Sequence, residues 1–140
     1  DKARIDLPSL TASLERFAYD WLSVISSETS IALNRVAVGH AGSDKRDLGA
    51  IVLENGRFAL ALRLKPVLEA AREKGLIVFD DAEEAFRTFF GLVARDTQMR
   101  LLLGDRLKLT EAAIGRDSGR ATHQFLALYG VHNEAGKARL

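Results

Sequence analysis

The sequence predicts an all-α protein, a helical bundle of about five or six helices, and three observations support this fold class. Ala, Leu, Arg and Glu, which favour helices, are abundant, whereas only 2 of the 140 residues are Pro. Apolar residues recur every three or four positions along several segments, which is the period of a helix buried on one side. The ends of these segments carry residues that cap helices. By length, we expect residues 1–140 to form a single domain.

The amino-acid composition argues against several classes of function. The net charge is +1 and the basic residues are scattered, so the chain lacks the concentrated basic face that phosphate binding requires. Cysteine is absent, which excludes disulfides and thiolate chemistry. No apolar run approaches the roughly 18 residues of a membrane span. We therefore expect a cytoplasmic protein that does not bind DNA through this segment alone.

Two helices are predicted in the first part of the chain. Apolar residues at helical spacing predict a helix over Ser9–Ser26, with Pro8 in its first turn. Ser27 is suited to cap a second, shorter helix that runs to about Gly39. The glycines of Gly39–Ser43 then predict a loop.

The segment Asp44–Lys74 has a helical pattern with one interruption, at Asn55-Gly56. This dipeptide is also a strong signal for a β-hairpin. A lone two-stranded hairpin is marginal in water and no other strand is predicted, so we favour a break between two helical pieces. Pro66 is expected to kink the second piece, and Gly75 to end it.

One long helix is predicted over Asp80–Gly104, capped by Asp81 at its start and by Gly104 at its end. It would span roughly 35 Å. A helix packed on a single core needs one apolar stripe. This segment has two, which indicates either a central core helix or a helix that also meets a second partner. The stripes consist of Phe86, Phe90, Val93, Thr97 and Leu101, and of Ala85, Phe89, Leu92, Met99 and Leu103.

The last predicted helix runs over Thr110–Tyr129, with Thr110 as its cap. Gly115 and Gly119 weaken its middle but lie on one side, where the absence of side chains permits close approach of another helix.

Signals for catalysis are weak. Acidic residues gather near residue 81, but helix-start electrostatics explains them without a catalytic role. The three histidines are far apart, and a metal site in the loop at His40 is much less expected than a solvated side chain. We therefore predict no enzyme activity, no metal and no cofactor. The residues considered were His40, His123 and His132, and Asp80, Asp81, Glu83 and Glu84.

Aromatic residues fall on positions predicted to face the core of several helices: Phe17, Trp21, Phe58, Phe86, Phe89 and Phe90. They either pack as an ordinary core or line a cavity for an apolar ligand, as in pockets between bundle helices. Asn34, His40 and Asn55 are candidate polar anchors for such a ligand.

Three stretches together resemble the C-terminal regulatory domain of TetR/AcrR-family transcriptional repressors. Arg100–Gly104 reads RLLLG, Phe125–Gly130 reads FLALYG, and Leu68–Ile77 reads LEAAREKGLI. The first two resemble the ends of the family's last two long helices, and the third resembles the run before the penultimate helix. The similarity extends from about Ser9 to Gly130.

The resemblance implies a homodimer that binds a small, largely apolar effector and contacts DNA through an N-terminal helix-turn-helix, which this chain lacks. We expect that segment to belong to a longer protein. The last two long helices would form an intermolecular four-helix bundle. A helical protein-interaction module without a ligand and, less expected, a small helical enzyme are the alternatives. The predicted ligand-binding residues are Phe17, Trp21, Phe58, Leu62, Phe86 and Phe90, and the predicted interface residues are Leu92, Met99, Leu103, Ala121, Phe125 and Leu128.

Overall fold

The computed structural model describes residues 5–42 and 47–131, and every regular element in these ranges is a helix. The fold class predicted from the sequence is confirmed. The described residues form seven helices rather than five or six, because the segment Asp80–Gly104 is divided in addition to the predicted break at Asn55-Gly56. Their bounds are α1 (Leu7–Ile25), α2 (Glu28–His40), α3 (Asp47–Asn55), α4 (Arg57–Glu73), α5 (Ala82–Ala94), α6 (Thr97–Leu102) and α7 (Glu111–Tyr129).

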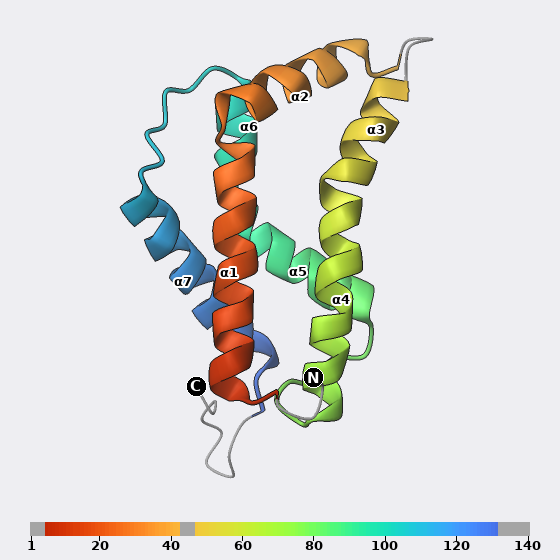
Figure 1. Cartoon of the computed structure of the whole chain (residues 1–140), viewed down its shortest axis with the longest axis vertical. Coiled ribbons are helices and arrows are strands. Elements are labelled where there is room, and N and C mark those ends of the chain that lie inside the picture. The colour runs from red at the N-terminus through yellow and green to blue at the C-terminus, as the bar shows by residue number, and fades with distance from the viewer. Residues whose placement is uncertain (1–4, 43–46, 132–140) are drawn as a thin grey trace.

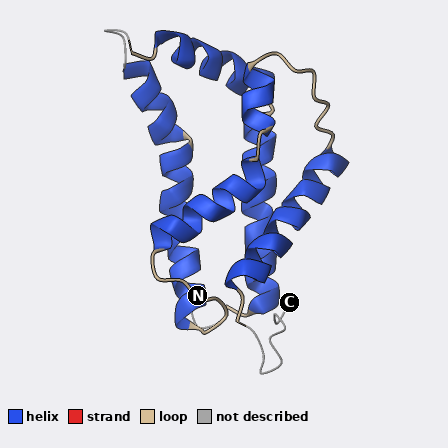
Figure 2. Ribbon diagram, turned by 180° about the vertical axis from the view of Figure 1, so that it is seen from behind, coloured by secondary structure: helices blue, strands red, loops and turns tan. Residues whose placement is uncertain are grey.

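The helices form a frame, and one helix crosses its middle. Helix α1 and the consecutive pair α3 and α4 are its two uprights, and α2 joins them at one end (Figure 1). Helix α5 crosses between the uprights, and α7 lies along the other side of α1, as the reverse view also shows (Figure 2). Helix α1 packs against α7, and α5 packs against both α4 and α7.

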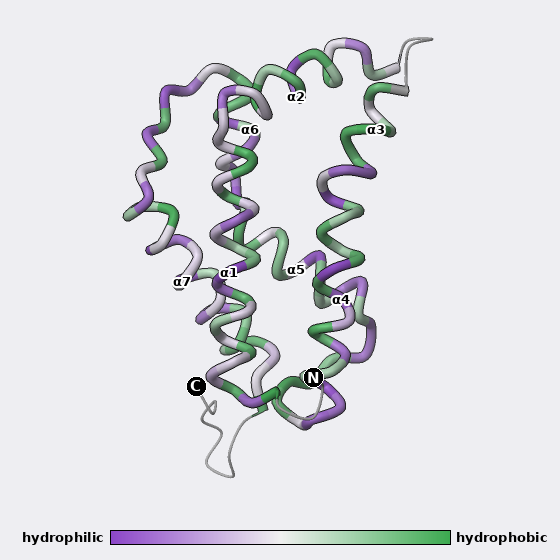
Figure 3. The backbone as a smooth tube through the Cα atoms, viewed as in Figure 1, coloured by the Kyte–Doolittle hydropathy of each residue, from purple (hydrophilic) through white to green (hydrophobic). Residues whose placement is uncertain are grey.

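The core lies where α1, α4, α5 and α7 meet. Helix α1 alternates hydrophilic and hydrophobic residues along its length (Figure 3), and its buried positions recur at helical spacing: Leu10, Leu14, Ala18, Leu22 and Ile25. Helix α5 contributes Phe86 and Phe89, and α7 contributes Phe125, all essentially without exposed surface. These three rings are the largest fully buried side chains of the described residues.

Local capping explains where most helices begin. The Asp6 carboxylate accepts from the Ser9 amide at 2.9 Å, and the Ser9 hydroxyl accepts from the Asp6 amide. Ser27, Asp81 and Thr110 cap α2, α5 and α7, as the sequence predicted, and the side chain of each accepts from one backbone amide in the first turn. Each cap satisfies an amide that has no partner within its helix.

The predicted long helix over Asp80–Gly104 is wrong, because the chain breaks between α5 and α6. Arg95 has φ 47° and ψ −131°, a conformation that no α-helix accommodates. Helix α6 then starts at Thr97 and ends at Leu102, two residues before Gly104, whose φ of 90° provides the predicted left-handed cap.

The predicted break at Gly56 is confirmed. Gly56 separates α3 from α4 with φ −107° and ψ −97°. A Cβ atom placed there would lie 3.0 Å from the Val52 carbonyl oxygen and 3.5 Å from the indole ring of Trp21. The chain therefore turns at a residue whose lack of a side chain permits close approach of the backbone.

The connector after α4 joins the end of the last helix. Gly75, with φ 73°, ends α4 as predicted. Ile77 pairs with Gly130 in an isolated antiparallel bridge, in which the Val78 amide donates to the Tyr129 carbonyl at 2.8 Å. Helix α2 runs to His40, slightly beyond its predicted end. The predicted loop at Ser43, the helix start at Asp44, and most of the predicted tail Val131–Leu140 lie outside the described residues.

Candidate ligand-binding site

A cavity of about 690 Å³ lies between the uprights of the frame, under α2. This volume is within the range of small-molecule sites in proteins. Five helices and the start of α4 supply its wall, which is mainly apolar. The apolar lining residues are Trp21, Val24, Ile25, Leu33, Ala37, Val38, Ala41, Ile51, Val52, Leu53, Phe90 and Leu102.

Few polar side chains reach this cavity: Ser30, Asn34, Asn55, Arg57 and Gln98. Two of them are already engaged on their own helices. The Asn34 amide nitrogen donates to the Ser30 carbonyl at 2.8 Å, and the Asn55 amide nitrogen donates to the Ile51 carbonyl at 2.8 Å. The side-chain carbonyl oxygens of Asn34 and Asn55 accept no hydrogen bond from the described residues and remain available as acceptors. A mainly apolar wall with a few polar groups is typical of sites for small organic molecules.

Trp21 and Phe90 form the aromatic part of the wall. Their ring centroids lie 5.3 Å apart, and Phe90 lies 5.9 Å from Phe86, which is fully buried beneath it. The indole nitrogen of Trp21 is shielded from solvent and has no hydrogen-bond partner among the described residues. A buried donor in this state costs about 1–3 kcal/mol.

Arg57 is the only charged residue among the described residues that line the cavity. Its guanidinium donates to Glu83 at 3.0 Å and lies 5.2 Å from the Phe86 ring and 5.7 Å from the Phe58 ring. Lys65 also forms an ion pair with Glu83. Hydrogen bonds from Lys65 and then Arg57 lower the pKa of Glu83 below its ordinary value. Two cations share one carboxylate here, which leaves one positive charge in excess.

The structure brings two of the six predicted ligand residues, Trp21 and Phe90, to this cavity. Phe17 lies instead at a smaller hollow of about 350 Å³ lined by α1 and by Arg63 of α4, whose guanidinium is 5.3 Å from the Phe17 ring. Phe86 is inside the core, whereas Phe58 is 44% exposed and Leu62 is 78% exposed. The prediction that Phe58 faces the core is therefore wrong.

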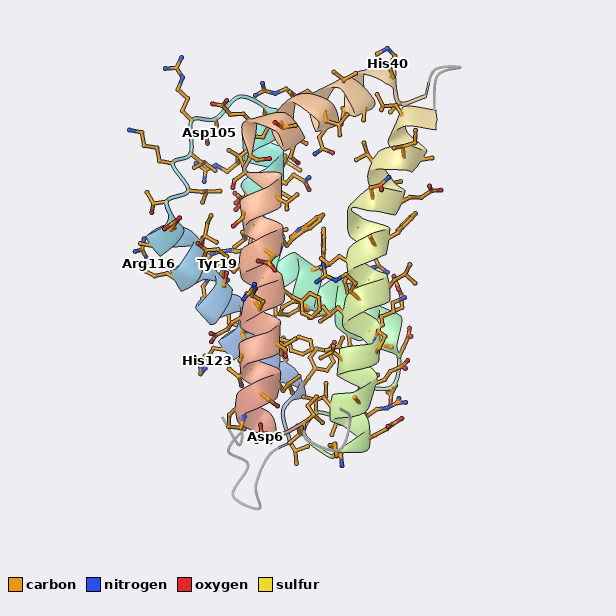
Figure 4. All side chains as sticks on the ribbon, in the orientation of Figure 1. Asp6, Tyr19, His40, Asp105, Arg116 and His123 are labelled. Atoms are coloured by element: carbon orange, nitrogen blue, oxygen red, sulfur yellow. The ribbon has the colours of Figure 1, made fainter. Side chains whose placement is uncertain are left out.

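The candidate polar anchors divide in the same way. Asn34 and Asn55 line the cavity. His40 lies at the end of α2 (Figure 4), where its ring is 2.9 Å from the Val36 carbonyl. Most lining residues that sequence reasoning missed are on α2, α3 and α6, and the others include Val24 and Ile25 on α1 and Arg57 at the start of α4. Helical spacing was visible in the sequence, but the cavity that these residues face depends on how the helices cross.

The predicted interface residues also separate by burial. Met99, Leu103 and Leu128 are 65%, 81% and 63% exposed, and Leu92 is half-buried. Ala121 and Phe125 have no exposed surface in this chain, and Phe125 packs against Phe89 and Tyr129 with ring centroids 5.3 and 4.7 Å away. These two side chains therefore have no surface left for a partner.

The outer side of α7 is open within the protomer. Cβ atoms placed on Gly115 and Gly119 would meet nothing within 4 Å. Arg116 and His123 lie on the outer side of this helix, away from the cavity (Figure 4). Arg120 turns back toward α5: burial and the charge of Arg95 lower its pKa, and it donates to the Leu92 carbonyl at 3.4 Å.

A long-range contact joins α2 to the far wall of the cavity. Arg35 donates from Nη2 to the Leu101 carbonyl at 3.0 Å and from Nε to the Leu102 carbonyl at 3.1 Å. These carbonyls end α6, where a cation is favoured by the helix dipole. Arg35 therefore fixes α6 against α2, which carries part of the same cavity wall.

Comparison with known proteins identifies the fold family. The sequence profile of the AefR-like transcriptional repressor C-terminal domain matches residues 12–131. The chain belongs to the TetR family of transcriptional regulators. The TetR-type resemblance read from the helix ends is thus confirmed.

Solved structures agree with the TetR assignment. The crystal structure of a TetR transcriptional regulator from Agrobacterium tumefaciens is 41% identical, with a TM-score of 0.80 over 91% of this chain and 64% of that chain. A Mesorhizobium loti protein, described as TetR-family, shares the fold with a TM-score of 0.78 at 21% identity, over 93% of this chain and 62% of the other. This chain thus spans less than two thirds of either protein. No curated protein matches the sequence.

No group of three or more His, Asp or Glu side chains in residues 5–42 and 47–131 is placed to hold a metal ion. Over the same ranges, no helix has both the length and the apolar character needed to cross a bilayer.

Proposed function

We propose that this domain senses a small, largely apolar effector and forms a homodimer, and that it thereby controls DNA binding, most simply repression, by a helix-turn-helix elsewhere in a longer cytoplasmic protein. The observation that carries the proposal is the cavity of about 690 Å³ between α1, α2, α3, α5 and α6. Its size and mainly apolar wall are those of a small-molecule site. Membership of a family of transcriptional regulators supports a regulatory role for that site rather than a catalytic one.

The position of the cavity supports a regulatory mechanism. Its wall includes α2, α3 and α6, which are joined to the core by single breaks and by the Arg35 contact. A ligand that contacts these helices differently in two arrangements shifts the population between them. Couplings of this kind are typically about 1–3 kcal/mol.

The chain contains a single tryptophan, and it lines the cavity, so its fluorescence is a direct probe of binding. Titration with a panel of hydrophobic compounds is expected to change Trp21 emission and to raise the melting temperature for the compounds that bind. A panel without any stabilising compound would favour a protein-interaction module with no ligand.

A matched pair of variants on α2 locates the effect. Leu33 lines the cavity and Val36 does not, yet their exposed fractions are similar, at 46% and 48%. Leu33→Glu is expected to weaken binding of neutral apolar compounds by about tenfold or more, because the carboxylate must be desolvated beside them. Val36→Glu is expected to leave binding unchanged. Equal effects from both variants would place the binding site elsewhere.

For the homodimer, we propose an interface formed by the outward faces of α6 and α7. Met99, Leu103 and Leu128 are exposed apolar side chains on these helices, and the open space at Gly115 and Gly119 would admit a helix of the partner. Large apolar side chains that are exposed to solvent often mark protein interfaces.

Light scattering after size exclusion tests the interface. The unmutated chain is expected at about twice its mass of 15.4 kDa. Leu103→Glu is expected to yield a folded monomer, while Leu62→Glu, equally exposed on α4, is expected to remain a dimer. A folded monomer for the unmutated chain would remove the dimer from the proposal.

A further inference from the structure

We infer that the effector is an apolar molecule with a single carboxylate, which the Arg57 guanidinium receives. This inference rests on the proposed function, since it assigns the chemistry of the ligand at the same cavity. Among the described lining residues, one is cationic and none is acidic. The electrostatic character of the wall therefore favours an anionic ligand and disfavours an amine.

Arg57 keeps its charge available although it is paired. Glu83 is its only hydrogen-bond partner among the described residues, and the contact uses one terminal nitrogen, Nη2. The guanidinium carries five N–H donors, so the others remain for a ligand. Lys65 binds the second carboxylate oxygen of Glu83, so that Glu83 is neutralised without the full charge of Arg57.

The surroundings of Arg57 hold it in position. Its guanidinium lies over the Phe86 ring at 5.2 Å and near the Phe58 ring at 5.7 Å, and its side chain is 28% exposed. Contact of the cation with two aromatic rings restricts the side chain, and a guanidinium held in place suits bidentate binding of a carboxylate.

The apolar wall begins next to this cation. Phe86, beneath Arg57, contacts Phe90, and Phe90 contacts Trp21. Phe90 and Trp21 face the cavity. A ligand with its carboxylate at Arg57 would therefore place its hydrocarbon part against these two rings, where burial of apolar surface drives binding.

Three probes that share one hydrocarbon chain test the headgroup: decanoate, decanol and decylamine, titrated below their solubility limits against Trp21 fluorescence at neutral pH. Decanoate is expected to bind at least about tenfold more tightly than decanol, and decylamine most weakly. The advantage of decanoate is expected to shrink as salt concentration rises, while decanol binding changes little.

Arg57→Gln is expected to remove the preference for decanoate over decanol without weakening decanol. Arg63→Gln is the matched control, because Arg63 is also on α4 and also stacks on an aromatic ring, at 5.3 Å from Phe17, but does not line the cavity. If Arg57→Gln fails to fold, the ranking of the three probes in the unmutated protein still decides the question.

The outcomes separate the two proposals. Equal binding of decanol and decanoate, tighter binding of decylamine, or an unchanged preference in Arg57→Gln would overturn the carboxylate assignment and leave an apolar effector site in place. Failure of all three probes to bind would overturn the apolar effector site together with the headgroup assignment.

Discussion

Replacement of Phe125 by Ala decides whether this side chain belongs to the core of one protomer or to a dimer interface. Phe125 has no exposed surface and packs edge-on against Phe89 and face-to-face against Tyr129. Truncation of a fully buried Phe costs about 3–5 kcal/mol, from lost burial and the cavity left behind. For a domain of 140 residues, about 1 kcal/mol shifts the melting temperature by roughly 3 °C, so we expect a loss of roughly 9–15 °C.

Phe58→Ala is the matched control, because it removes the same atoms from a side chain that is 44% exposed. Loss of about half the burial and of the contact with Arg57 costs about 1–2 kcal/mol. Calorimetry of both variants measures the loss of stability. Light scattering at a temperature about 20 °C below the melting transition measures the oligomeric mass of the folded variants. We expect Phe125→Ala to keep the oligomeric mass of the unmutated protein. A monomer with an unchanged melting temperature would refute its placement in the core.

Three further changes test local features of the fold. Thr110→Ala removes a helix cap and is expected to cost about 1 kcal/mol of unfolding free energy, measured by urea denaturation, whereas Thr110→Ser should retain it. Arg95→Gly is expected to raise the melting temperature, because φ 47° with ψ −131° strains any residue other than glycine by about 1–3 kcal/mol. Arg95→Ala keeps a Cβ atom and should not raise it. Glu83 has a lowered folded-state pKa, so its bonds to Arg57 and Lys65 stabilise the protein above the ordinary value of 4.5 and are lost as pH falls through the lowered value. The stability difference between the unmutated chain and Glu83→Gln should therefore stay constant above about pH 5 and shrink in acid; a constant difference down to pH 2 would contradict this.

Helix starts could be predicted because the interactions that fix them are local. The Ser27 hydroxyl accepts from the Ser30 amide, and the Thr110 hydroxyl accepts from the Ala113 amide. Both bonds span three residues, so a short stretch of sequence contains the donor and the acceptor. The same holds for Gly104, whose left-handed backbone conformation is accessible to glycine wherever the rest of the chain lies.

Which residues line the cavity could be predicted only in part. Helical spacing gives the direction of a side chain around its own helix but not what stands opposite it. Phe86 and Leu62 were assigned to one site, yet the first is buried beneath the cavity wall and the second is 78% exposed. Their surroundings are set by how α4 crosses α5, which depends on packing between segments distant in sequence.

The two breaks that shape the cavity differ in how visible they are in the sequence. Gly56 marks the first break by its own chemistry. The second break follows an alanine, and the residues around it, Ala-Arg-Asp-Thr, are ordinary in a helix. A tertiary contact accompanies it, since Arg35 bonds the last carbonyls of α6 from more than sixty positions away. A straight continuation of α5 would not bring those carbonyls to α2.

Each break changes the direction of the chain, so that one short helix forms part of the cavity wall. Beyond Gly56, α3 brings Val52 and Asn55 to the wall, and beyond Arg95, α6 brings Gln98 and Leu102. Two unbroken helices would pass the cavity as straight rods and leave it open on these sides. The strained backbone at Arg95 and the glycine at Gly56 are therefore the positions at which a ligand that contacts α3 and α6 would act on the frame.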